Sequence, residues 1–167
     1  KPVPDELREI IFGSLEVEGA KPAKSSAVQT YAILDAARIR NVVEILETSG
    51  LEHRCLFKGE ALEEFKDVAP WVVKIEEGHN FTRNLFTQSD APQHLWCRDP
   101  GIFIRSGASL DEIWSHFRKF TRARDADGSL LYLRFYSAVY LPAYLGALAC
   151  EKRGRFFGPT DPLICQT

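Results

Sequence analysis

The chain has 167 residues, of which 45% are hydrophobic and 26% are charged, and its formal net charge is -2. This composition predicts one globular domain with a buried core, and it disfavours a strongly basic nucleic-acid-binding protein or a protein that attaches to an anionic membrane surface. No apolar run approaches the roughly 20 residues that span a bilayer. Because the net charge is also close to neutral, neither a membrane nor a nucleic acid is expected as a partner.

Residues 1–26 are predicted to form an N-terminal helix and a connector. Leu7, Ile10 and Ile11 fall on one face of a helix that would end near Phe12. The following segment, EVEGAKPAKSS, contains Gly, Pro, Lys and Ser, which are typical of loops. Residues 27–167 are therefore expected to form a single α/β domain.

From residue 31 to residue 75, the pattern predicts strands that alternate with helices. Short apolar runs indicate strands at 31–34, 53–57 and 71–75, and the first of these is typical of a strand that is covered on both faces. The apolar spacing after Asp35 predicts a helix that ends at Gly50. A shorter helix is predicted at 60–67, before Pro70.

The middle of the chain contains a clear helix start. A short helix is predicted at 81–86, a loop at 87–100 and a strand at 101–105. Ser109 and Glu112 have the spacing of a capping box, in which each residue satisfies a backbone N–H of the other. In the helix that follows, the apolar spacing places Trp114, Phe117 and Phe120 among the residues that face the core.

A β-hairpin is predicted around Asp127-Gly128, between strands at 121–125 and 130–136. Alternation in the second strand places Leu131, Leu133 and Phe135 on a core face and Tyr132, Arg134 and Tyr136 on the opposite face. A last helix is predicted at 141–149. Together these elements predict an α/β fold with a mixed sheet of about six strands, flanked by helices, and a β-hairpin in the C-terminal half.

Two polar residues at strand ends are candidates for chemistry. Asp35 ends the first strand, where α/β enzymes often bind ligands, but no glycine-rich phosphate loop follows it. His79 could act as an acid or base, although a turn with Asn80 or Thr82 as a helix cap explains the same residues. A small enzyme that uses Asp35 or His79 remains an alternative, with no catalytic residue assigned.

The four cysteines give no support to a metal site. Cys55, Cys97, Cys150 and Cys165 are far apart and contain no C-x-x-C pair. We interpret them as reduced thiols in a cytosolic protein. Neither a metal nor a cofactor is expected.

The hairpin carries the residues that best fit a binding surface. Arg122, Arg124 and Arg134 could lie beside Tyr132 and Tyr136. Basic and aromatic side chains on a sheet can bind single-stranded nucleic acid, which remains a second alternative. Because aromatic residues and Arg are also enriched at protein interfaces, we predict that these five residues bind a protein partner.

Several stretches, taken in order, resemble the type VI secretion effector-adaptor family, whose domain has been classed as a domain of unknown function. They are YAILDAAR, CLFKGE, DVAPWVVKI, GIFIRSGASLDEIWSHFRKFTRAR and LLYLRFYSAVYL, with FFGP after them. The resemblance covers nearly the whole chain from Tyr31. Family members usually have Asp-Pro after the RFY motif, where this chain has Ser137 and Ala138.

The resemblance implies a non-enzymatic chaperone or adaptor in the cytoplasm of a Gram-negative bacterium. Such a protein binds one secreted toxic effector and helps to load it onto the spike protein, which would be a second partner. Many members carry a further helical lobe beyond this domain. This chain, which ends at Thr167, is therefore expected to be a short member or an N-terminal lobe.

Overall fold

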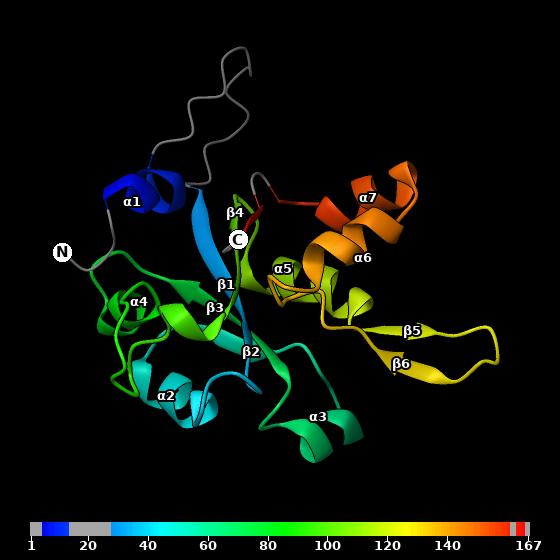
Figure 1. The fold of residues 1–167 in the computed structure, drawn as a ribbon, viewed down its shortest axis with the longest axis horizontal. Coiled ribbons are helices and arrows are strands. Elements are labelled where there is room, and N and C mark those ends of the chain that lie inside the picture. Colours follow the sequence, from blue (N-terminus) through cyan, green and yellow to red (C-terminus); the bar gives the residue numbers. More distant parts are fainter. Residues whose placement is uncertain (1–4, 14–27, 161–162, 166–167) are drawn as a thin grey trace, which may run out of the picture.

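The central strand of the fold is β1 (Gln29–Asp35), and from Thr30 onward all of its residues are buried. Its side chains alternate between two separate cores: Ala32 and Leu34 belong to one, and Tyr31 and Ile33 belong to the other. This confirms the prediction that the first apolar run is a strand covered on both faces. The computed structural model describes residues 5–13, 28–160 and 163–165 (Figure 1).

Five strands form the main sheet, in the order β2-β3-β1-β4-β7. The other four strands are β2 (His53–Cys55), β3 (Pro70–Ile75), β4 (Gly101–Ser106) and β7 (Leu163–Cys165). All described pairings are antiparallel. The helices and strands confirm the α/β class. The prediction of a mixed sheet is wrong, because no described strand pair is parallel. The alternation of strands and helices predicted the strands from β1 to β4, but it predicted neither β7 nor the place of β3, which inserts between β1 and β2 and is antiparallel to both.

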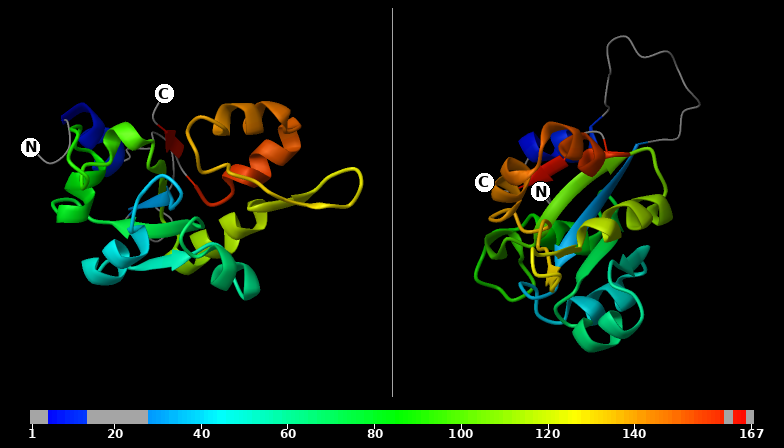
Figure 2. Two further views of the ribbon diagram at one scale, coloured as in Figure 1. Left: turned by 60° about the horizontal axis from the view of Figure 1, so that its bottom comes forward. Right: turned by 90° about the vertical axis from the view of Figure 1, so that its right-hand side faces the viewer.

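Helices cover both faces of this sheet (Figure 2). On one face, the core includes residues of α1, α2, α3 and α4, and on the other it includes residues of α5, α6 and α7. The helices are α1 (Asp5–Phe12), α2 (Val42–Ser49), α3 (Glu60–Phe65), α4 (Asn80–Leu85), α5 (Leu110–Phe117), α6 (Leu141–Ala147) and α7 (Cys150–Phe157). The predicted connector at 16–26 lies outside the described residues.

Helix α5 begins as its sequence predicts. The Ser109 hydroxyl accepts a hydrogen bond from the Glu112 backbone N–H, and the Glu112 carboxylate accepts one from the Ser109 backbone N–H. Trp114 and Phe117 are buried, while Phe120 is half-buried in the short 3-10 helix after α5. The indole Nε1 of Trp114 donates to the Cys55 carbonyl at 2.6 Å, which ties α5 to β2.

The predicted hairpin is present, as β5 (Arg122–Arg124) and β6 (Leu130–Tyr132). Gly128 in its turn has φ +84°, a conformation that glycine adopts without steric cost. The predicted alternation along residues 130–136 is wrong, because the strand ends at Tyr132. Leu131 is 45% exposed, whereas Phe135 and Tyr136 are both buried.

The C-terminal region differs from the expected single helix at 141–149. Helix α6 ends at Ala147, Leu148 is extended, and α7 follows from Cys150. Helix α7 was not predicted because its sequence, CEKRGRFF, has a central glycine, which disfavours a helix. In the structure, Phe156 is its one buried residue. A short 3-10 helix at Trp96–Arg98 also lies within the predicted loop 87–100.

Candidate functional site

Tyr132, at the end of β6, lies against two aromatic rings from the other side of the domain. Its ring centroid is 5.1 Å from that of Phe57, which follows β2, and 5.5 Å from that of Phe65, at the end of α3. Tyr132 itself remains 41% exposed. Although the hairpin extends away from the sheet and its helices, its base therefore packs on the α3 region (Figure 1).

These rings form the wall of a surface groove of about 270 Å³. Its lining residues come from the β1–α2 connection, the region around α3, and the hairpin with the segment after it: Ala37, Phe57, Phe65, Val68, Tyr132, Arg134 and Tyr136. Val68 is 49% exposed beside the rings. We call this feature the hairpin groove.

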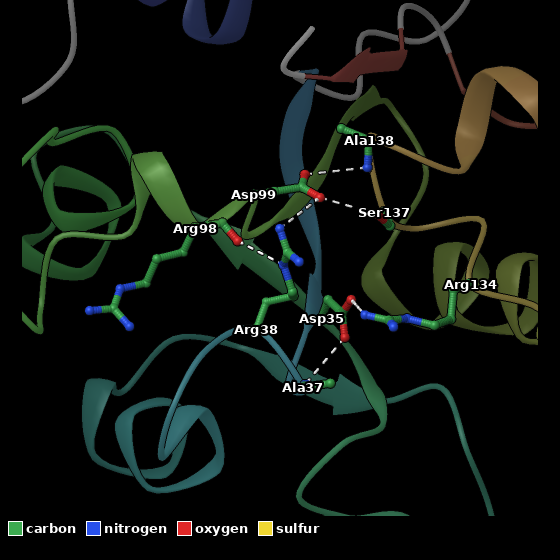
Figure 3. A network of polar contacts seen from close by, with 8 residues as sticks. All are labelled: Asp35, Ala37, Arg38, Arg98, Asp99, Arg134, Ser137 and Ala138. Atoms are coloured by element: carbon green, nitrogen blue, oxygen red, sulfur yellow. Dashed lines mark hydrogen bonds and ion pairs between the residues drawn. The ribbon is translucent and has the colours of Figure 1, made fainter.

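An ion pair holds one side of the hairpin groove (Figure 3). The Arg134 Nη2 donates to Oδ2 of Asp35, and the backbone N–H of Ala37 donates to Oδ1 at 3.2 Å. Asp35 is fully buried, whereas the Arg134 side chain is 40% exposed. The hydrogen bond to Asp35 raises the pKa of the Arg134 guanidinium, and partial burial opposes this shift. Arg134 therefore contributes a fixed positive charge whose position the sheet determines.

Tyr136 lies close enough to this ion pair to interact with both Asp35 and Arg134. Only 3% of it is exposed, and burial raises the pKa of its phenol far above the ordinary value, with the nearby Asp35 carboxylate adding to the shift. Tyr136 is therefore a neutral group in the groove lining. The expectation that Tyr132, Arg134 and Tyr136 share one exposed face is wrong, because the chain leaves the strand after Tyr132 and turns inward.

A second polar anchor fixes the segment that follows Tyr136. The Asp99 carboxylate accepts hydrogen bonds from the Ser137 hydroxyl at 3.1 Å and from the Ala138 backbone N–H at 3.3 Å (Figure 3). Arg38 lies 3.7 Å from the same carboxylate, and its Nε donates to the Arg98 carbonyl. Asp99 has φ +50°, which is uncommon for a residue other than glycine. Two carboxylates near the sheet thus hold the base of the hairpin region.

The other two predicted binding residues lie on β5. The Arg122 guanidinium is 5.5 Å from the Tyr132 ring centroid and 5.9 Å from that of Phe57, at the rim of the hairpin groove. Arg124 donates to the Gly128 carbonyl at 2.7 Å, within the hairpin. Within the described part of the chain, neither arginine forms an ion pair. Because Arg134 is directed to Asp35, the three arginines do not form one continuous basic face.

Asp35 and His79, the candidate enzyme residues, are engaged in structural contacts at separate places. Asp35 ends β1, while His79 follows β3, whose last residue pairs with Thr30 near the start of β1. Asp35 is five positions beyond Thr30 along the strand, which corresponds to about 17 Å. His79 caps α4: its Nδ1 accepts from the Phe81 backbone N–H at 3.1 Å, and its Nε2 contacts the Ser49 carbonyl.

The prediction of a turn and a helix cap at this place is therefore confirmed, with His79 as the capping residue in place of Asn80 or Thr82. Among residues 5–13, 28–160 and 163–165, no cluster of three or more His, Cys, Asp or Glu side chains could hold a metal ion. Cys55, Cys97 and Cys150 are free thiols, and burial raises the pKa of Cys55 to about 11.

Phe57, Phe65 and Val68 were not recognised as site residues from the sequence. Apolar residues near a short helix are ordinarily core residues. Nothing in the local pattern distinguishes a core position from a groove wall. The hairpin that completes the groove lies more than 60 residues further along the chain.

No helix in the described ranges is long and apolar enough to cross a membrane.

Comparison with known proteins gives one match, which is to a protein family. No curated protein and no solved structure matches the chain significantly. Residues 30–155 match the family described as Domain of unknown function (DUF4123). Because this match spans most of the chain, the protein belongs to the DUF4123 family, a family of type VI secretion effector adaptors or chaperones.

Proposed function

We propose that this protein is a cytoplasmic adaptor that binds one secreted effector and helps to load it onto the spike protein of a type VI secretion apparatus. Membership of a secretion adaptor family supports this role. The family is not an enzyme family, and we infer that the chain acts by binding alone. The groups that an enzyme would bring together, Asp35 and His79, instead serve as an ion-pair partner and a helix cap.

The observation that carries the proposal is the hairpin groove with the exposed apolar side chains around it. Leu130 and Leu131 are 47% and 45% exposed on β6, and Tyr140 is 54% exposed. Tyr140 is also close to the groove, since its ring centroid is 5.8 Å from the Arg134 guanidinium. A surface of Tyr, Phe and aliphatic residues interspersed with Arg has the composition of a protein–protein interface.

The hairpin also offers a backbone surface. Among the described strands, β6 pairs only with β5, so the other edge of β6 is open. A two-stranded ribbon is only marginally stable alone, and an open edge with exposed apolar side chains can accept a strand from a partner. We infer that the effector covers this edge and the hairpin groove together.

The test is capture of the tagged protein from the native cytosol, with identification of its partners by mass spectrometry, followed by titration calorimetry with the purified effector. Tyr132→Ala is expected to weaken effector binding by about 30-fold, as for an interface residue worth about 2 kcal/mol. Ile10→Ala is the matched control, because Ile10 is 50% exposed on α1, away from the hairpin. Absence of any secreted effector, or equal binding by Tyr132→Ala, would contradict the proposed function or its site, respectively.

A further inference from the structure

Arg122 combines two properties at the rim of the hairpin groove. Its guanidinium lies near the rings of Tyr132 and Phe57, and in the described part of the chain no carboxylate is within ion-pair distance of it. The neighbouring acid Asp125 is used in the hairpin turn, where Oδ1 accepts from the backbone N–H groups of Asp127 and Ser129. Arg122 therefore keeps its hydrogen-bonding capacity for a partner.

Two of the three other arginines near aromatic rings are paired with a carboxylate, whereas Arg118, 4.5 Å from the Trp114 ring centroid, forms no ion pair within the described residues. Arg54 lies 3.5 Å from the Trp114 ring centroid and also bonds Asp111 at 2.6 Å. Arg134 lies near Tyr140 and bonds Asp35. Arg122 lacks the acid that completes these two arrangements. A partner that supplies a carboxylate beside the groove would complete it in the same way.

The size of the hairpin groove indicates what enters it. Its volume of about 270 Å³ is close to the lower end of the range of about 300–1,000 Å³ that is usual for small-molecule sites, and it can accommodate one bulky apolar side chain. Arg134 has further N–H donors on its exposed portion, which can bind a backbone carbonyl of an incoming chain. These features fit a segment of polypeptide better than a free ligand.

We propose that the hairpin groove binds an extended acidic segment of the effector. One bulky apolar side chain of the segment enters the groove, and a carboxylate two residues away binds Arg122. In an extended chain, side chains two positions apart point to the same side and lie about 7 Å apart. The Arg122 guanidinium is 5.5 Å from the ring centroid of Tyr132, which lines the groove, so two such side chains can reach the groove and Arg122 together. This inference rests on the proposed adaptor function and specifies the chemistry of the segment that the adaptor recognises.

The experiment uses a displayed library of random dodecapeptides, selected on the purified full chain. Selected peptides are then synthesised with a fluorescent label, and their binding is measured by fluorescence anisotropy. We expect the enriched sequences to share a bulky apolar residue with Asp or Glu two positions away. Enrichment of sequences without such a pair, or no enrichment, would overturn the inference.

A charge swap tests the role of Arg122 directly. Arg122→Glu is expected to weaken binding of a selected acidic peptide at least tenfold and to restore binding when Lys replaces the carboxylate of the peptide. Arg83→Glu is the matched control and should bind like the wild type, because Arg83 is on α4, which lies at the opposite end of the molecule from the hairpin in Figure 1. Arg122→Gln serves if the Glu variant fails to fold. Equal binding of the acidic peptide by wild type and a folded Arg122 variant would refute the role of Arg122.

Two further measurements separate this inference from its alternatives. A labelled twelve-residue oligothymidylate that competes with the peptide, and whose own binding depends on Arg122, would assign the surface to nucleic acid and overturn the inference. If the effector binds wild type and Arg122→Glu equally while Tyr132→Ala loses it, the adaptor function stands and the acidic-segment inference fails. If wild type binds no effector at all, the proposed function fails, whatever the peptides show.

Discussion

The guanidinium of Arg134 bonds the fully buried carboxylate of Asp35, although 99 positions separate the two residues in the sequence. Asp35 ends the central strand, and Arg134 immediately precedes the buried pair Phe135 and Tyr136. The contact therefore connects the middle of the sheet to the base of the hairpin. It determines where Tyr132 and the hairpin groove lie relative to α3.

Reversing the charge of Arg134 should destabilise the fold. Arg134→Glu places a second carboxylate against a buried one, and we expect a loss of about 2–4 kcal/mol in the free energy of unfolding, below the full value for a buried pair because Arg134 is partly exposed. Urea denaturation measures this change. Arg124→Glu makes the same charge change at an exposed site and should alter stability by less than about 0.5 kcal/mol. Equal midpoints for the two variants would show that the ion pair does not support the fold.

Phe117 should be among the most costly residues to truncate. It is fully buried, and its ring centroid is 5.7 Å from those of both Phe135 and Phe156. Phe117→Ala is therefore expected to lower the free energy of unfolding by about 3–5 kcal/mol, through lost burial and the cavity that remains. Val139→Ala, at an exposed apolar site, is the control and should have little effect. An unchanged denaturation midpoint for Phe117→Ala would contradict the core position of α5.

The capping box of α5 should make stability depend on acid pH. Hydrogen bonds from the backbone and hydroxyl of Ser109 lower the pKa of Glu112. A carboxylate with a lowered folded-state pKa contributes stability above its unfolded pKa of about 4.3, and this contribution is lost as the pH falls through the folded pKa. The stability difference between wild type and Glu112→Gln should therefore be constant near neutral pH and shrink below about pH 5.

Denaturation midpoints at a series of pH values measure this difference. In a Ser109→Ala background, both hydroxyl-dependent contacts of the box are removed, so the pH-dependent difference between Glu and Gln at position 112 should become smaller. A difference that grows as the pH falls would have the wrong sign for a lowered pKa and would contradict the capping geometry.

Gly158, at the end of α7, should not tolerate a side chain. It has φ +45°, and an added Cβ would lie 2.2 Å from Cε1 of His116, whose ring is held by a 2.8 Å hydrogen bond to the Phe156 carbonyl. We expect Gly158→Ala to lower the free energy of unfolding by about 1–3 kcal/mol, from backbone strain and the clash together. Gly146→Ala in α6 meets open space and should be neutral or slightly stabilising.

A double-mutant cycle separates the two contributions at Gly158. Replacing His116 by Ala in the Gly158→Ala background removes the clash, so part of the lost stability should return while the backbone strain remains. Strictly additive effects of the two substitutions would show that the α5–α7 contact is looser than the structure describes.

Local interactions explain what the sequence by itself determined. The capping box of Ser109 and Glu112, the helix end at Gly50 and the turn at Asp127-Gly128 each involve residues within four positions, and all three are present. The buried run of β1 was also predictable, because a strand covered on both faces has no polar alternation to preserve. The ordered motifs from Tyr31 onward were sufficient to indicate the family that the match over residues 30–155 confirms.

Only the tertiary structure decided which strands are neighbours, where the second hairpin strand ends, and what Arg134 contacts. Periodicity gives the face of each element but not its partner, so the insertion of β3 between β1 and β2 was not predictable from the pattern. The burial of Tyr136 follows from packing of the turn after Tyr132 against the buried Asp35, not from any local preference. The hairpin groove likewise exists because long-range contacts bring β6 against α3, and sequence patterns do not encode such contacts over tens of residues.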